Sequence, residues 1–171
     1  FDLASRAELW NEACGALDTA IRKKQVDTLE AKHSKAVLYH QMSIEAEASG
    51  NYAKALKLSK RASKEEPGFV PAQVRLAHLL MSSGKRDKAI KILEAAWAVS
   101  PNPEIAHAYW PLTDARNALS RMKAAHKLAV FNPTSPTTKL MLVQNALDAG
   151  LWSDARKNLE EIRTSDEPVT R

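Results

Sequence analysis

Two histidines are the residues whose type and spacing best suit chemistry in this chain. His40 and His78 occur in two copies of a repeated pattern, and a neutral imidazole can ligate a haem iron or a metal ion. The pair is therefore our candidate for haem ligation, and the alternative is that both rings are exposed or hydrogen-bonded. His33, His107 and His126 show no partner pattern, so we expect them to be surface or local packing residues.

The motifs that mark common enzymes do not occur in the sequence. It contains no Gly-rich phosphate loop, no HExxH, no GxSxG and no paired-carboxylate motif. Its single cysteine, Cys14, excludes an internal disulfide and a Cys-rich zinc site, and we expect it to be a small packing residue. The sequence therefore predicts a non-catalytic protein without a metal or cofactor, with haem binding through the two histidines as the alternative.

A pattern that repeats after 34 residues surrounds the two histidines. The corresponding pairs are Gly50 and Gly84, Tyr52 and Arg86, Ala55 and Ala89, Leu56 and Ile90, Ala62 and Ala96, and Pro67 and Pro101. Four of these six pairs are identical. A period of 34 residues is typical of the tetratricopeptide repeat (TPR), a helix hairpin that buries its apolar face only by stacking on a neighbour. The sequence thus predicts an all-α, right-handed TPR solenoid.

Helical periodicity and the positions of Gly and Pro set the expected elements. Helices are predicted over 4–24, 28–49, 51–65, 70–83, 86–99, 104–110, 115–131, 137–149 and 152–163. These form one domain over 1–171: a half-repeat helix (4–24), repeats over 28–67 and 70–101, a degenerate repeat (103–133), a terminal repeat (136–163) and a frayed tail (164–171). Asp27 or Thr28 should cap the second helix, and Pro111 should end the helix before it.

The four tryptophans all fall within expected helices. We expect core packing for each, and anchoring of an interface is the alternative. They are Trp10, Trp97, Trp110 and Trp152.

The first helix of each TPR unit usually faces a concave groove. The groove residues predicted by position are Val37, His40, Ile44 and Glu47, then Pro71, Val74, His78 and Met81, and finally Thr137, Leu140, Gln144 and Leu147. TPR domains that clamp a peptide carboxyl terminus resemble one another in Lys and Asn at places where this chain has His40, Ile44, Val74 and His78. The mixture of apolar residues and His instead favours an apolar helix or extended segment of a partner protein.

Charge and hydropathy argue against nucleic acid as a partner and against a membrane-spanning helix within this chain. The net charge is +5, but acidic residues are interleaved with basic ones and no run of Lys and Arg exceeds three, so we expect no nucleic-acid binding. No apolar run approaches the roughly 18 residues of a membrane-spanning helix. The chain begins at Phe1 without Met, and we expect it to be a piece of a longer protein, with any targeting or anchoring segment in the part that is missing.

Several short segments resemble one bacterial family. The segments 66–72 (EPGFVPA), 93–97 (LEAAW) and 100–109 (SPNPEIAHAY), with 119–122 and Asn132-Pro133, are similar to the C-terminal TPR region of HemY-like proteins. The resemblance covers nearly the whole chain. It implies an upstream anchor in the bacterial inner membrane, a TPR region on the cytoplasmic face, and a scaffold role in haem biosynthesis. It implies no enzyme reaction.

The repeats and the resemblance together favour a non-catalytic scaffold for protein–protein interaction. Its partner would be a protein or peptide, with haem-pathway enzymes as the candidates. The alternative is a module that binds or transfers haem or porphyrin through His40 and His78.

Overall fold

The computed structural model describes the backbone of residues 2–23 and 26–166 and the side chains of residues 9–23 and 26–163. Within those ranges every regular element is a helix and no strand occurs, so the expected all-α class is confirmed. The helices are α1 (Asp2–Arg22), α2 (Thr28–Ala48), α3 (Tyr52–Glu65), α4 (Val70–Ser82), α5 (Arg86–Val99), α6 (Pro103–Leu112), α7 (Ala118–Ala129), α8 (Pro136–Asp148) and α9 (Trp152–Asp166).

Contacts between residues divide the chain into two compact units. Unit 1 runs to Lys85 and contains α1 to α4, and unit 2 starts at Arg86 and contains α5 to α9. The boundary falls inside the expected repeat over 70–101. A single solenoid over 1–171, with the repeat boundaries expected from the sequence, therefore stays a prediction, and each unit is described by itself.

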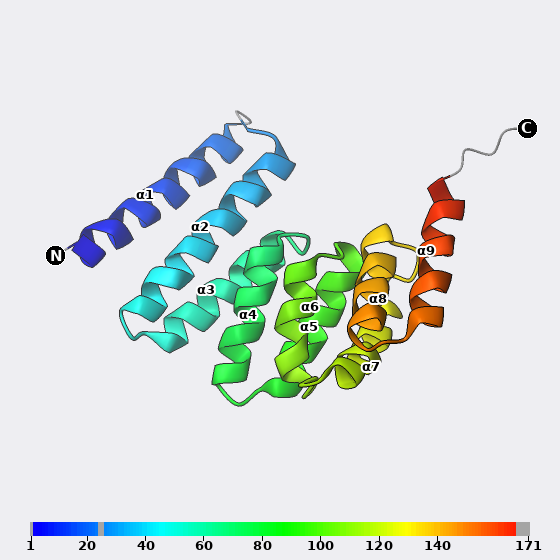
Figure 1. Ribbon diagram of the computed structural model, residues 1–171. Helices are drawn as coiled ribbons and strands as arrows, with labels where there is room; N and C mark the ends of the chain where they lie inside the picture. The colour runs from blue at the N-terminus through cyan, green and yellow to red at the C-terminus, as the bar shows by residue number, and fades with distance from the viewer. Residues whose placement is uncertain (1, 24–25, 167–171) are drawn as a thin grey trace, which may run out of the picture. The chain divides into compact units, whose positions relative to one another are not determined.

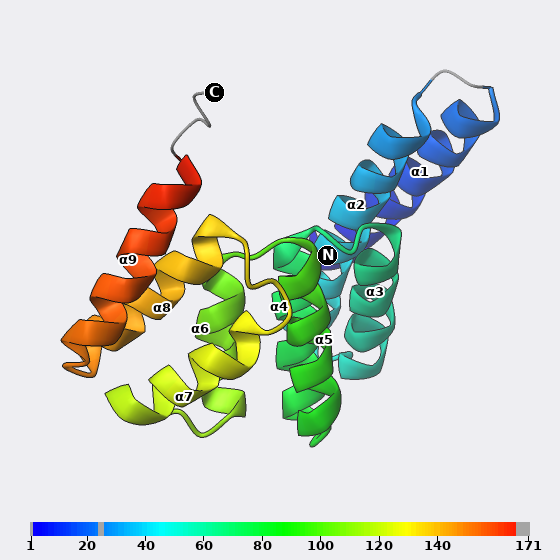
Figure 2. The ribbon, with the colours of Figure 1, turned by 90° about the vertical axis from the view of Figure 1, so that its right-hand side faces the viewer.

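Unit 1 is built from antiparallel neighbours. α1 lies beside α2, α2 beside α3, and α4 contacts both α3 and α2 (Figures 1 and 2). Ala46, Ala55, Leu58 and Leu79 form a buried cluster that joins α2, α3 and α4. Because an alanine side chain ends at Cβ, the fully buried Ala55 lets α3 approach its neighbours closely.

Polar caps and one glycine set the helix ends of unit 1. The Asp27 side chain accepts a hydrogen bond from the Leu29 amide at 3.0 Å, so the cap of α2 is Asp27, one of the two expected candidates. After α2, Gly50 adopts a φ of +76°, which only glycine adopts without strain. Asn51 then caps α3 through the Lys54 amide. The chain therefore reverses between α2 and α3 within a few residues.

Unit 2 has its own core around α5 and α6. Trp97, Leu93, Ile105, Tyr109 and Leu112 are all fully buried there. Sequential helices contact one another from α5 to α9, and α8 and α9 lie side by side in both views (Figures 1 and 2). Large side chains thus fill the space between α5 and α6, in contrast to the small residues that join α2 and α3.

The predicted ends of α6 and α7 were wrong. α6 continues past Pro111 to Leu112, because a proline in the last turn removes a single N–H while the carbonyls of Tyr109 and Trp110 still accept from Thr113 and Ala115. α7 begins at 118 rather than 115. Asp114 has a φ of +53°, which lies outside the right-handed helical region. Asn117 is the N-cap of α7 and forms a capping box with Ser120, which sets the start of the helix.

Two further expectations about the C-terminal part also needed correction. Trp152 is 70% exposed, so it is not a core residue. Among the α9 residues whose side chains the structure describes, only Ala155 is fully buried, so neighbouring helices leave Trp152 largely uncovered. Residues 164–166 continue α9 instead of fraying, and the rest of the expected tail lies outside the described residues, as does residue 24 of the expected first helix.

Candidate functional site

The predicted groove residues of unit 1 lie on α2 and α4. Val37, Ile44, His78 and Met81 are exposed, and His40, Glu47 and Val74 are partly buried. Spacings of three and four residues place each set along one side of its helix. The structure thus gives these residues a common surface on each helix, and partner binding by that surface stays a prediction.

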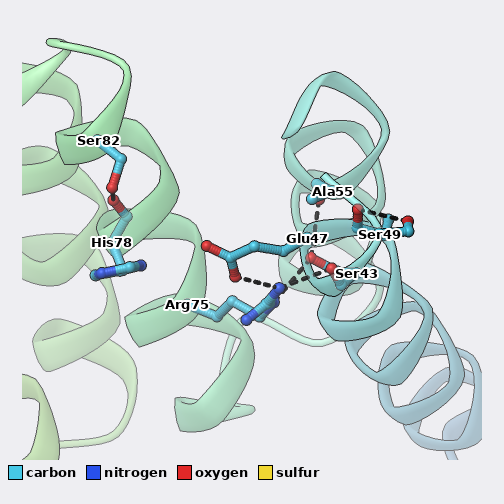
Figure 3. A network of polar contacts seen from close by, with 8 residues as sticks. Ser43, Glu47, Ser49, Ala55, Arg75, His78 and Ser82 are labelled. Carbon is cyan, nitrogen blue, oxygen red and sulfur yellow. Dashed lines mark hydrogen bonds and ion pairs between the residues drawn. The ribbon is translucent and has the colours of Figure 1, made fainter. Parts of the chain in front are cut away.

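Arg75 of α4 forms hydrogen bonds with residues of α2. Its Nε donates to Oγ of Ser43 at 2.8 Å, and its second guanidinium nitrogen donates to the Ser43 carbonyl at 2.7 Å and to Oε2 of Glu47 at 2.8 Å (Figure 3). Oγ of the fully buried Ser43 donates onward to the Ala55 carbonyl at 2.9 Å. Arg75 therefore connects α4 to α2 and, through Ser43, to α3.

This network changes the role expected for Glu47. Its carboxylate is paired with a guanidinium whose side chain is only 14% exposed, so Glu47 orders the hairpins and is not a free anion on the groove. The sequence reasoning missed both Arg75 and Ser43. In the sequence each is simply a polar residue among apolar neighbours, and this pattern does not show that the two side chains contact each other.

His40 and His78 have different surroundings. The His40 ring packs edge-on against Phe69, with ring centroids 5.6 Å apart, and its Nδ1 is buried with no hydrogen-bond partner in the described chain. Burial, and secondly the positive charge of Arg75, lower the pKa of His40. His78 is exposed on α4. Ligation of a haem iron or metal by this pair therefore stays a prediction.

Neither of two hollows described on unit 1 includes these histidines. One, of about 510 Å³, lies among Glu47, Tyr52, Leu56, Leu79 and Ser82. The other, of about 250 Å³, lies among Leu9, Trp10, Ala13, Gln41 and Glu45. Haem binding through His40 and His78 therefore stays a prediction.

The parts of the chain that the structure describes contain no group of three or more His, Cys, Asp or Glu residues that could hold a metal ion. In the same parts, no helix has the length and hydropathy needed to cross a membrane. Cys14 is half-buried on α1, and burial, followed by the charge of Asp18, raises the pKa of its thiol. A raised pKa lowers the fraction of nucleophilic thiolate at neutral pH.

The largest of the hollows described here, about 690 Å³, lies within unit 2. Its apolar lining comes from α5, α6 and α8 and comprises Trp97, Ala106, Trp110, Leu140, Met141 and Val143. Leu140, a predicted groove residue, is 54% exposed, whereas Trp97, which lines the same cavity, is fully buried. The cavity therefore has a buried aromatic floor and an exposed aliphatic wall.

Polar side chains complete the lining of this cavity. They include His107, Arg121, Gln144 and Asp148. Gln144 and Thr137, like Leu140, are predicted groove residues that line this cavity. Nε2 of Gln144 donates to Oδ1 of Asp148 at 3.0 Å. His107 is exposed, which agrees with the expected surface position, whereas Trp110, expected in the core, is only partly buried. No pattern in the sequence singles out Arg121. Only folding brings these residues to one cavity, because they lie on different helices.

Comparisons with known proteins bear on the fold. Residues 46–109 match the family model described as tetratricopeptide repeat, which is less than half of the chain. A comparison with curated proteins finds no match. The match and the helix hairpins confirm the expected TPR-like fold class and identify a TPR region in this chain.

Several solved structures are similar to the chain at low identity. One is a putative kinesin light chain with nearly identical TPR-like repeats from Podosopora anserina, at 18% identity, with 95% of this chain and 94% of that chain covered and a TM-score of 0.43. MamA from Desulfovibrio magneticus RS-1 has 18% identity, coverage of 95% and 97%, and a TM-score of 0.41. A tetratricopeptide repeat protein from Parabacteroides merdae has 16% identity, coverage of 96% and 65%, and a TM-score of 0.45. Similarity at this level carries no information about ligands or partners.

Proposed function

We propose that this chain is a non-catalytic scaffold that docks a segment of a partner protein. The supporting observation is the cavity of about 690 Å³ in unit 2, where Leu140 and Gln144, two residues predicted to bind a partner, lie beside Trp110. Aromatic side chains in partly desolvated pockets contribute most to protein–protein binding. An exposed leucine next to such a ring is stabilised when a partner covers it.

The test is site-specific photo-crosslinking in the full-length protein. A benzophenone amino acid replaces Leu140 in one variant and Val130 in the control, which is also exposed and apolar but does not line the cavity. We expect a discrete crosslinked protein from position 140 and none from position 130. Equal products from both positions, or none from position 140, would contradict docking in the cavity.

We further propose that the full-length protein is anchored in the bacterial inner membrane, with this region on the cytoplasmic face, and that it serves haem biosynthesis. The support is the resemblance of segments 66–72, 93–97 and 100–109 to HemY-like proteins. Candidate partners are therefore haem-pathway enzymes. Protease should digest this region in inverted inner-membrane vesicles and not in intact spheroplasts, and the opposite result would contradict the orientation.

The identity of the crosslinked protein tests the link to haem. Mass spectrometry of the product from position 140 should identify a haem-pathway enzyme. A product from an unrelated pathway would leave the scaffold role intact and remove the assignment to haem biosynthesis.

A haem- or porphyrin-binding module is the second candidate. One observation favours it: burial lowers the pKa of His40, which keeps more of its imidazole in the neutral form that ligates iron. Hemin is added to the wild type, to His40→Ala, to His78→Ala and to the exposed control His126→Ala. The scaffold proposal predicts no shift of the Soret band. A shift that disappears with His40→Ala or His78→Ala, but persists in the control, would favour the second candidate.

A further inference from the structure

The unit 2 cavity contains a cation without a counterion. Arg121 of α7 lines the cavity and is half-buried, and its guanidinium makes no hydrogen bond or ion pair with any residue in the described chain. A guanidinium carries five N–H donors and no acceptor. Its partial burial therefore makes an added carboxylate ligand more favourable here than at a fully solvated arginine.

Two other polar side chains that line the cavity also lack a hydrogen-bond partner. The indole N–H of Trp110 and the ring of His107 form no hydrogen bond within the part of the chain that the structure describes. Asp148, the acidic residue of the lining, accepts one hydrogen bond from Gln144 and keeps its negative charge. The unpaired N–H donors of Arg121 and Trp110 suit a ligand that supplies acceptors.

The apolar half of the cavity is already ordered. The Trp110 ring packs edge-on against the buried Tyr109, with centroids 6.2 Å apart and an angle of 73° between the planes. Leu140 and Met141 of α8 also line the cavity. A volume of about 690 Å³ lies within the range of specific ligand pockets and can hold a few side chains of a peptide. Little ordering is therefore needed when an apolar side chain enters.

We propose that this cavity recognises a short peptide segment in which an aromatic or branched apolar residue lies next to Asp or Glu. The apolar side chain packs against Trp110 and Leu140, and the carboxylate pairs with Arg121. This inference rests on the proposed scaffold function and specifies the chemistry of the docked segment.

Selection from a displayed library of random short peptides against the immobilised, purified chain tests the inference. We expect enrichment of an acidic residue beside Trp, Phe, Leu or Ile. Selected peptides are then synthesised with a fluorescent label, and fluorescence polarisation measures the dissociation constant. Arg121→Glu should weaken binding by about tenfold or more, the effect typical of losing a charge-assisted hydrogen bond. Replacing the acidic residue of the peptide by Lys should restore binding to Arg121→Glu.

Lys123→Glu is the matched control, because it makes the same charge change on the exposed side of α7 outside the cavity lining. Its effect on the dissociation constant should stay within about twofold, since exposed charges are strongly screened by salt. Circular dichroism verifies that each variant is folded. Arg121→Gln removes the charge without adding a new one and gives a second measurement if Arg121→Glu does not fold.

Two other results would overturn the inference. Peptides that bind without acidic enrichment, and that lose affinity with Leu140→Asp but not with Arg121→Gln, would show an apolar docking site that ignores charge. The scaffold function would then stand. Enrichment of no peptide would reject the cavity as a peptide site, and crosslinking from position 140 would decide the scaffold function separately.

Discussion

Nε of Arg75 lies 2.8 Å from Oγ of Ser43, and this contact joins two residues that are 32 positions apart, one on α4 and one on α2. The same guanidinium also binds the Ser43 carbonyl and Glu47. Because Ser43 is fully buried, this hydrogen-bonded network forms where α2, α3 and α4 meet. It fixes the relative positions of these helices within unit 1.

Replacing Arg75 by Ala should lower the free energy of unfolding by about 1.5–3 kcal/mol, because the charge-assisted hydrogen bonds are lost and the Glu47 carboxylate loses its counterion. Urea unfolding followed by circular dichroism measures the change. Lys60→Ala, at an exposed position of α3, is the control and should change stability by less than about 0.5 kcal/mol. Equal effects of the two substitutions would show that the network does not stabilise unit 1.

His40 should make unit 1 less stable in mild acid. Burial, and then the charge of Arg75, lower its pKa below the ordinary 6.5, so the unfolded chain takes up a proton at a higher pH than the folded chain does. Stability therefore falls as the pH drops through 6.5 and continues to fall until the pH reaches the lowered pKa. In His40→Leu this contribution is absent, and the loss of stability between neutral pH and pH 5 should be smaller than in the wild type.

Urea unfolding at several pH values measures this difference for both proteins. An NMR titration of the His40 ring provides an independent measurement of its pKa. A value at or above 6.5 would contradict the predicted direction.

Gly50 and Gly15 should respond to alanine with opposite signs. Gly50 has a φ of +76°, where a Cβ costs about 1–2 kcal/mol, although the added atom would meet nothing within 4 Å. Gly15 lies inside α1 and also has open space around a new Cβ. Because alanine favours the helix over glycine, Gly15→Ala should stabilise the chain by about 0.5–1 kcal/mol. Thermal unfolding should show a lower midpoint for Gly50→Ala and a higher one for Gly15→Ala, and a shift of both in one direction would refute this account.

Thr138→Val should destabilise unit 2 although it nearly preserves the side-chain volume. Oγ1 of Thr138 accepts a hydrogen bond at 3.1 Å from Nε1 of Trp97, and both residues are fully buried. Valine leaves the indole N–H unpaired, which costs about 1–3 kcal/mol. Thr137→Val is the matched control, since Thr137 is partly exposed and its hydroxyl forms no hydrogen bond among the described residues. Unfolding followed by tryptophan fluorescence should show a clear loss only for Thr138→Val.

The α2–α3 and α8–α9 hairpins could be predicted from the sequence because their determinants are local. The 34-residue spacing of Gly50 and Gly84, and the apolar periodicity between them, reflect how one helix ends and the next begins. Leu140 and Gln144 could be placed on the predicted groove for the same reason, since the repeat defines which side of a helix each residue occupies. The end of α6 and the exposure of Trp152 could not be predicted. They depend on how the chain turns after Pro111 and on how much of α9 its neighbour covers.

The sequence by itself therefore determined the all-α class, the approximate place of each helix and the pairing of α2 with α3 and of α8 with α9. Only the tertiary structure decided that Arg75 binds Ser43 and Glu47, and that Arg121 and Trp110 border the same cavity as Leu140. The physical reason is that helix periodicity is a property of neighbouring residues, whereas these contacts depend on side chains from separate helices reaching the same point. No regular spacing in the sequence predicts which side chains of separate helices contact one another.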